Sequence, residues 1–112
     1  PMSYIPGTAE EFLRAGREQR STIAKKLATG SDEDERREHR DEALAIVNGV
    51  EAAAYSRSHD VGFTRPYIEL LGEIQTLRGY LHERSAPVRM ILEHLALVAP
   101  QELAQKAVSS KQ

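Results

Sequence analysis

Apolar residues at helical spacing between positions 67 and 81 constrain the fold most strongly. Five of them follow one another at intervals of three or four positions: Tyr67, Leu70, Ile74, Leu77 and Leu81. In an α-helix this spacing puts the five side chains on one side, and such a stripe packs against other helices. Pro66 is well placed in the first turn, where its missing amide hydrogen needs no partner. The pattern predicts a helix over residues 65–83.

The start of the chain carries signals for the beginning and the end of a helix. Thr8 and Glu11 match a capping box, which opens a helix over residues 8–28. Within this helix, Gly16 is the position where we consider a break. Gly30 suits the C-terminal cap, because glycine adopts a left-handed backbone without strain.

The following segment combines a polar start with an apolar second half. Ser31 and the acidic residues after it open a helix over residues 32–58, because a helix N-terminus favours negative charge. Residues 32–42 carry opposite charges four positions apart but no apolar stripe. The stripe begins only afterwards, with Ala43, Ile46, Val47, Val50, Ala53 and Ala54. We therefore predict that residues 32–42 form a solvated helical spur ahead of a buried half.

Pro87 leaves two interpretations of the last third open. The helical spacing continues beyond it with Val88, Ile91, Leu95 and Val98. Either one long helix kinks at Pro87, or a turn over residues 83–86 precedes a new helix over residues 87–99. No Gly or Asn stands directly before Pro87 to cap an ending helix, which slightly favours the kink. A last short helix is predicted over residues 100–108.

Together these segments predict an all-α bundle of four or five helices in a single domain, residues 1–112, with flexible ends at residues 1–7 and 109–112. Alternating runs with a period of two, which are typical of strands, do not occur. The N-terminal residues lack the basic and apolar stretches of a secretory signal, and no apolar run nears the ~18 residues of a membrane span. We therefore expect a cytoplasmic protein that does not associate with membranes.

Composition and spacing exclude several kinds of chemistry. The chain has no cysteine, so disulfides, thiolate metal sites and cysteine nucleophiles are ruled out. The four histidines, at positions 39, 59, 82 and 94, lack the spacing that puts two ligands on one helix face. No phosphate-binding loop or catalytic motif is present. We therefore predict no metal and no cofactor.

Nucleic-acid binding is also disfavoured. Fifteen basic and 17 acidic side chains give a net charge of −2, which provides no excess positive charge for a phosphate backbone. A helix-turn-helix beginning at residues 21–28 would have four carboxylates at the start of its second helix, residues 32–35, facing the phosphates.

The third predicted helix has a second stripe almost opposite the apolar one. Ile68, Gly72, Gln75 and Gly79 line up there at 100° per residue. A glycine in an exposed helix interior is ~1 kcal/mol less favourable than alanine, so two of them need a reason. One interpretation is that another backbone packs closely here, because the helix is central in the bundle or because the stripe is a subunit contact. The other is that the stripe is a suboptimal surface that faces solvent. For a subunit contact we predict Ile68, Gly72, Gly79 and Tyr80.

The polar spur and the lack of a catalytic motif favour a protein that presents helix faces to other proteins. We predict a small interaction module, a homodimer that regulates or inhibits a larger partner, because twofold dimers are common and enlarge a thin core. For the partner contact we predict Arg36, Arg37, His39 and Arg40, since arginine is enriched at interfaces. His39 continues the apolar stripe and is expected at its edge, hydrogen-bonded and not a ligand.

A small-ligand binder or enzyme is the alternative. Its pocket would lie between the second and third predicted helices and be lined by Tyr55, Tyr67, Glu69 and Glu73. Glu69 and Glu73 are four residues apart, so their like charges need compensation, for which we consider nearby arginines. An enzyme is disfavoured but stays open, because a helical bundle can assemble a site from scattered residues.

Overall fold

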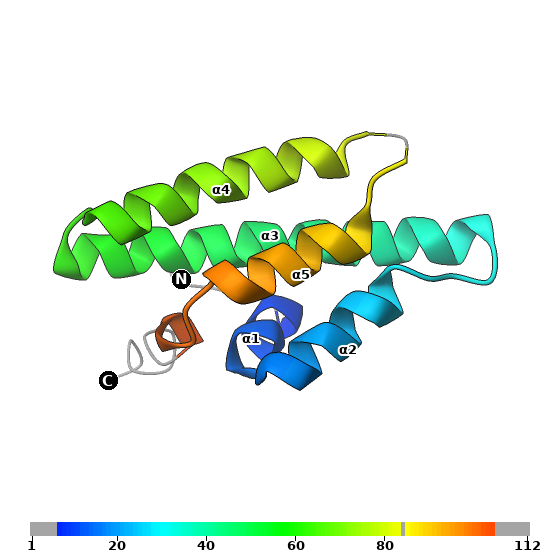
Figure 1. The fold of residues 1–112 in the computed structure, drawn as a ribbon, viewed down its shortest axis with the longest axis horizontal. Helices are drawn as coiled ribbons and strands as arrows, with labels where there is room; N and C mark the ends of the chain where they lie inside the picture. Colours follow the sequence, from blue (N-terminus) through cyan, green and yellow to red (C-terminus); the bar gives the residue numbers. More distant parts are fainter. Residues whose placement is uncertain (1–6, 84, 105–112) are drawn as a thin grey trace.

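The computed structural model describes residues 7–83 and 85–104, and these residues form helices joined by short loops, without a strand. The five longer helices are α1 (Gly7–Arg14), α2 (Arg17–Leu27), α3 (Glu33–Val61), α4 (Arg65–Leu81) and α5 (Val88–Val98) (Figure 1). A short helical turn follows at residues 102–104. The prediction of a small all-α bundle is therefore confirmed.

The ends of the chain are described only in part. Of the predicted flexible ends, residues 1–6 and 109–112 lie outside the described residues, whereas Gly7 already begins α1. Residues 105–108 of the last predicted helix also lie outside them.

α3 is the longest helix and forms the spine of the molecule. α4 runs back along it as the second arm of a helical hairpin, while α1 and α2 lie on the side of α3 away from α4 (Figure 1). α5 packs against both α2 and α4 and closes the bundle. All five helices contribute to the core, and the apolar stripe predicted on residues 67–81 is buried along its whole length.

The segment predicted as a helix over residues 8–28 is two helices, with the break at Gly16 that we considered. The carbonyl groups that this break frees are bound by a side chain. The side chain of Arg20 binds the carbonyls of Phe12 and Leu13, which a continuous helix would have bonded to its own amides.

Arg20 is a buried charged group, with only 4% of its surface exposed. Its Nε donates to the carbonyl of Phe12 at 2.8 Å, and Nη2 donates to that of Leu13 at 2.9 Å. Nη1 donates to the carbonyls of Ala96 and Ala99, at 2.7 and 2.9 Å. One guanidinium thus satisfies carbonyls at the C-terminal ends of both α1 and α5. Burial lowers the pKa of Arg20, because desolvation disfavours the charged form.

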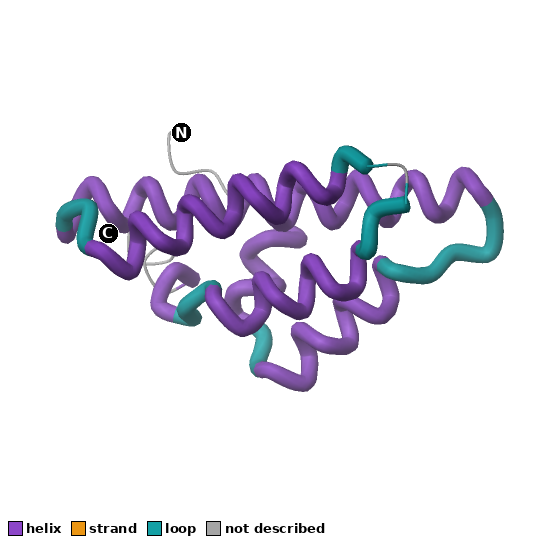
Figure 2. Tube along the Cα trace, turned by 45° about the horizontal axis from the view of Figure 1, so that its top comes forward, coloured by secondary structure: helices purple, strands orange, loops and turns teal. Residues whose placement is uncertain are grey.

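α4 and α5 are separate antiparallel helices, so the favoured kink at Pro87 is wrong. α4 ends at Leu81, two residues before the predicted end, and the chain reverses before α5 begins (Figure 2). The amide of Ile91 donates to the carbonyl of Pro87 at 3.0 Å, in the first turn of α5. The two helices share an apolar spacing because both face the same core, not because they are continuous.

The polar start of α3 extends beyond the ends of α2, α4 and α5, as predicted for the spur (Figure 1). Asp32 caps it by accepting from the amide of Glu35 at 2.8 Å, and Glu35 accepts from the amide and the hydroxyl of Ser31. The expected cap at Gly30 is wrong, since α2 ends earlier, with residue 28 as its cap. A Cβ on Gly30 would lie 2.6 Å from Cγ of Arg36, so close approach is what requires glycine there.

α3 ends three residues later than the predicted boundary at 58. The amide of Gly62 donates to the carbonyl of Ser58 at 2.7 Å, which completes the last turn, and Val61 is the final helical residue. Gly62 then turns the chain with a φ of 96°, a conformation that glycine adopts without strain. α4 starts as predicted, with Pro66 in its first turn.

Candidate functional site

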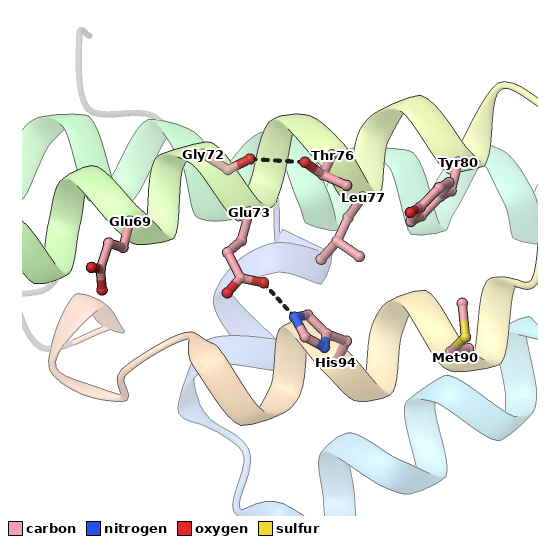
Figure 3. A pocket seen from close by; sticks show the side chains of 8 residues that line it. All are labelled: Glu69, Gly72, Glu73, Thr76, Leu77, Tyr80, Met90 and His94. Atoms are coloured by element: carbon pink, nitrogen blue, oxygen red, sulfur yellow. Dashed lines mark hydrogen bonds and ion pairs between the residues drawn. The ribbon is translucent and has the colours of Figure 1, made fainter.

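A groove of about 540 Å³ lies between α4 and α5. Figure 3 shows side chains from both helices around it. Its lining consists of Glu69, Gly72, Glu73, Thr76, Leu77, Tyr80, Met90 and His94. We call it the α4–α5 groove.

A hydrogen-bonded pair joins the two walls of this groove. Nε2 of His94 lies 2.5 Å from Oε1 of Glu73 (Figure 3). The two side chains are 44% and 46% exposed, so the pair is in contact with water. The pair connects α4 to α5 across the groove.

The groove has an acidic end and an apolar end. Glu69 lies one helical turn before Glu73 on α4, and both point toward the groove (Figure 3). At the other end, exposed Tyr80 and Met90 stand beside buried Leu77.

A second groove, of about 650 Å³, lies along α5 and reaches the C-terminal end of α2. Its lining consists of Ala28, Ala86, Pro87, Val88, Arg89, Met90, Glu93, His94 and Leu97. Met90 and His94 therefore belong to both grooves. Arg89 and Glu93 form an ion pair of 3.1 Å in this second lining. We call the surface formed by the linings of the two grooves the recognition face.

The residues predicted for a self-contact are all exposed. Ile68, Gly72, Gly79 and Tyr80 lie outside the core, and a Cβ added to either glycine would meet no atom within 4 Å. Among the residues that the structure describes, no helix packs against the stripe, so the expectation of a central position is wrong. Gly72 and Tyr80 line the α4–α5 groove, whereas Ile68 and Gly79 do not belong to that lining.

The pocket predicted between the second and third helices, α3 and α4, is not assembled by its four residues. Tyr67 is buried in the core, whereas Tyr55 is exposed and packs edge-on against Phe63 at 6.2 Å. Glu69 and Glu73 line the α4–α5 groove together, and that groove faces α5. Two residues along a helix correspond to a 200° rotation, so Tyr67 and Glu69 cannot share a face of α4.

Tyr67 instead belongs to a polar cluster at the end of the bundle. Its hydroxyl donates to a carboxylate oxygen of Glu102. Desolvation raises the pKa of Tyr67, and the Glu102 carboxylate raises it further, while Arg57 acts in the opposite direction.

The residues predicted for a partner contact lie on the spur, and two of them bind the loop that precedes it. Arg36 donates to the carbonyl of Gly30 at 3.2 Å, and His39 Nδ1 lies 2.5 Å from the carbonyl of Thr29. His39 is thus hydrogen-bonded at the edge of the structure, as expected. Arg40 is half-buried, whereas the side chain of Arg37 is 66% exposed. Arg36, His39 and Arg40 are three or four positions apart on α3, and a partner contact at these four residues stays a prediction.

Most residues of the recognition face are not among the predicted site residues, including Met90, His94 and Leu97. A signal for Met90 and Leu97 is present in the sequence. Met90 and Leu97 are seven positions apart, which repeats one helix face, and neither belongs to the buried stripe of Ile91 and Leu95.

Comparisons with protein-family models, with curated proteins and with solved structures each give no match to this chain. Among residues 7–83 and 85–104, no helix has both the length and the apolar character needed to cross a membrane.

Proposed function

We propose that this chain is a protein–protein interaction module and that the recognition face receives the partner. One observation carries the proposal: Tyr80, Met90 and Leu97 are 41%, 54% and 71% exposed on two neighbouring helices. Single exposed apolar side chains are ordinary on a folded protein, but a group of them around grooves is typical of an interaction site.

The polar groups of the recognition face also support the proposal. His94 is paired with Glu73, Arg89 is paired with Glu93, and the hydroxyl of Thr76 donates to the carbonyl of Gly72 at 3.3 Å. A partner can cover these groups without leaving them unpaired, which would otherwise oppose binding.

The proposal also includes the cellular location, the regulatory role and the dimer that were predicted from the sequence. The module acts in the cytoplasm as a regulator or inhibitor, by occupying a surface of a larger protein. It also forms a twofold dimer through the exposed stripe of α4, where Ile68 is apolar and Gly72 and Gly79 leave space for another backbone.

Comparative capture tests the recognition face. Wild-type protein, Met90→Ser/Leu97→Ser and Val61→Ser/Phe63→Ser are immobilised and exposed to the same lysate. The second variant is a matched control, because Val61 and Phe63 are 46% and 51% exposed and do not line either groove. We expect one stoichiometric partner on the wild type and the control, reduced about tenfold or more on Met90→Ser/Leu97→Ser. Equal capture by all three proteins would reject the recognition face.

A small-ligand site is the second candidate function. The volume of the α4–α5 groove falls within the ~300–1,000 Å³ of small-molecule sites, and the pair of Glu73 and His94 provides converging polar groups. A ligand-induced rise in melting temperature across a panel of metabolites, abolished in His94→Phe, would favour this candidate.

A further inference from the structure

The shape of the α4–α5 groove suits an elongated occupant. From Glu69 to Tyr80 its α4 wall covers eleven steps along the helix, or about 16 Å at 1.5 Å per residue. This length corresponds to about three turns of a helix laid along the groove.

The charges of the groove indicate the chemistry of that occupant. The lining contains two carboxylates and one imidazole, with neither lysine nor arginine. Glu73 is paired with His94, but within the described part of the chain Glu69 has no cationic partner. An occupant with a basic group at this end would therefore complement the charges of the groove.

The apolar end restricts the occupant further. Tyr80 and Met90 face each other from α4 and α5 beside buried Leu77 (Figure 3). On a helical occupant, apolar side chains spaced one turn apart can reach this end of the groove, while basic side chains of the same helix reach Glu69 and Glu73.

On the basis of the proposed function, we infer that the occupant of the α4–α5 groove is a basic amphipathic helix of the partner protein. Its apolar face lies against Tyr80, Leu77 and Met90, and its lysines or arginines pair with Glu69 and Glu73. A basic helix in an acidic, apolar groove is an established mode of peptide recognition.

Two synthetic peptides of about 16 residues probe this inference. Both carry leucines at helical spacing, and the flanking positions are lysine in one peptide and glutamate in the other. Binding is measured by fluorescence anisotropy to the wild type, to Glu69→Gln/Glu73→Gln and to Glu18→Gln/Glu38→Gln. The last variant is the matched control, because both of its residues are exposed and lie outside the groove.

We expect the lysine peptide to bind the wild type and the control equally, and to bind Glu69→Gln/Glu73→Gln at least about tenfold more weakly. The glutamate peptide should also bind the wild type at least about tenfold more weakly than the lysine peptide. Equal affinity of the two peptides, unchanged affinity of Glu69→Gln/Glu73→Gln, or no binding by either peptide overturns the basic helix as occupant.

Met90→Ser/Leu97→Ser separates this inference from the proposed function. If both peptides bind the wild type equally and both are lost in this variant, the recognition face stands and the basic occupant is rejected. If the lysine peptide binds this variant with the same affinity as it binds the wild type, the recognition face is also rejected. Light scattering that shows a dimer dissociated by Met90→Ser/Leu97→Ser would make a second copy of the chain the occupant, which also overturns the inference.

Discussion

At the scale of single residues, Arg20 supplies the hydrogen bonds that two helix ends lack. The last carbonyls of a helix have no amide partner within it, and burying them unpaired is unfavourable. The guanidinium provides four donors to such carbonyls and lies 5.1 Å from the centre of the Phe12 ring. These charge-assisted bonds offset the desolvation of a buried cation.

Replacing Arg20 tests this role. Arg20→Met keeps an apolar stem but leaves the four carbonyl contacts unmade, so we expect the free energy of unfolding to fall by about 2–4 kcal/mol. Urea denaturation followed by circular dichroism measures the change. Arg17→Met is the control, since Arg17 is exposed and its replacement should change stability by less than about 0.5 kcal/mol. A loss below about 1 kcal/mol for Arg20→Met would show that water replaces the guanidinium.

Glu35 provides a pH-dependent contribution to stability. Hydrogen bonds from the amide and the hydroxyl of Ser31 hold the pKa of Glu35 below its ordinary value of 4.5. A carboxylate whose pKa is lower in the folded state stabilises above its unfolded pKa, and this stabilisation is lost as the pH falls through the folded pKa. Wild type should therefore exceed Glu35→Gln in stability near neutral pH, and the difference should shrink below about pH 4.5.

Unfolding of the two proteins in urea, measured at several pH values, gives this difference directly. Glu38→Gln serves as the control, because Glu38 is exposed on the same helix and makes no bond to the cap. A difference between wild type and Glu35→Gln that stays constant from neutral to acidic pH would contradict the role of the cap.

At the scale of helices, local chemistry explains which boundaries were predictable. The stripe from Tyr67 to Leu81 and the cap around Asp32 depend on residues within a few positions of one another, and both are visible in the sequence. The sequence marks Gly16 and Pro87 as possible breaks but does not decide between a break and a continuous helix, because contacts with distant segments also matter. Arg20, for example, reaches carbonyls 76 and 79 positions away, and no local pattern indicates such contacts.

The exposed glycines of α4 allow a prediction about stability and assembly together. Gly72→Ala/Gly79→Ala fills open space, so helix propensity should stabilise the single chain by about 1 kcal/mol per substitution. If the stripe is the dimer contact, the added methyl groups should at the same time weaken self-association, measured by light scattering of the eluting peak.

Gly62→Ala provides a contrast on the same hairpin. Its φ of 96° is strained for alanine, so this substitution should destabilise the protein by about 1–3 kcal/mol.

Unchanged self-association in Gly72→Ala/Gly79→Ala, together with higher stability, would assign the stripe to solvent and remove it from the proposed dimer.

At the scale of the whole molecule, the recognition face exists because α4 and α5 are antiparallel. In a continuous helix, Tyr80 and Met90 would be separated by ten residues, or about 15 Å. The reversal instead places both beside one groove. The individual candidates Glu69, Glu73, Gly72 and Tyr80 could be selected from the sequence, but their common site could not, because it requires the direction of the next helix.

The ends of the two helices that Arg20 binds are synthesised at different times. The carbonyl of Ala99 is made 79 residues after Arg20 itself. At roughly 5–20 residues per second, a ribosome takes some 4–16 seconds to cover that distance. Throughout this time the nascent chain holds a cation whose native site is only half built. Until α5 has been made, Arg20 therefore lacks two of its four carbonyl partners.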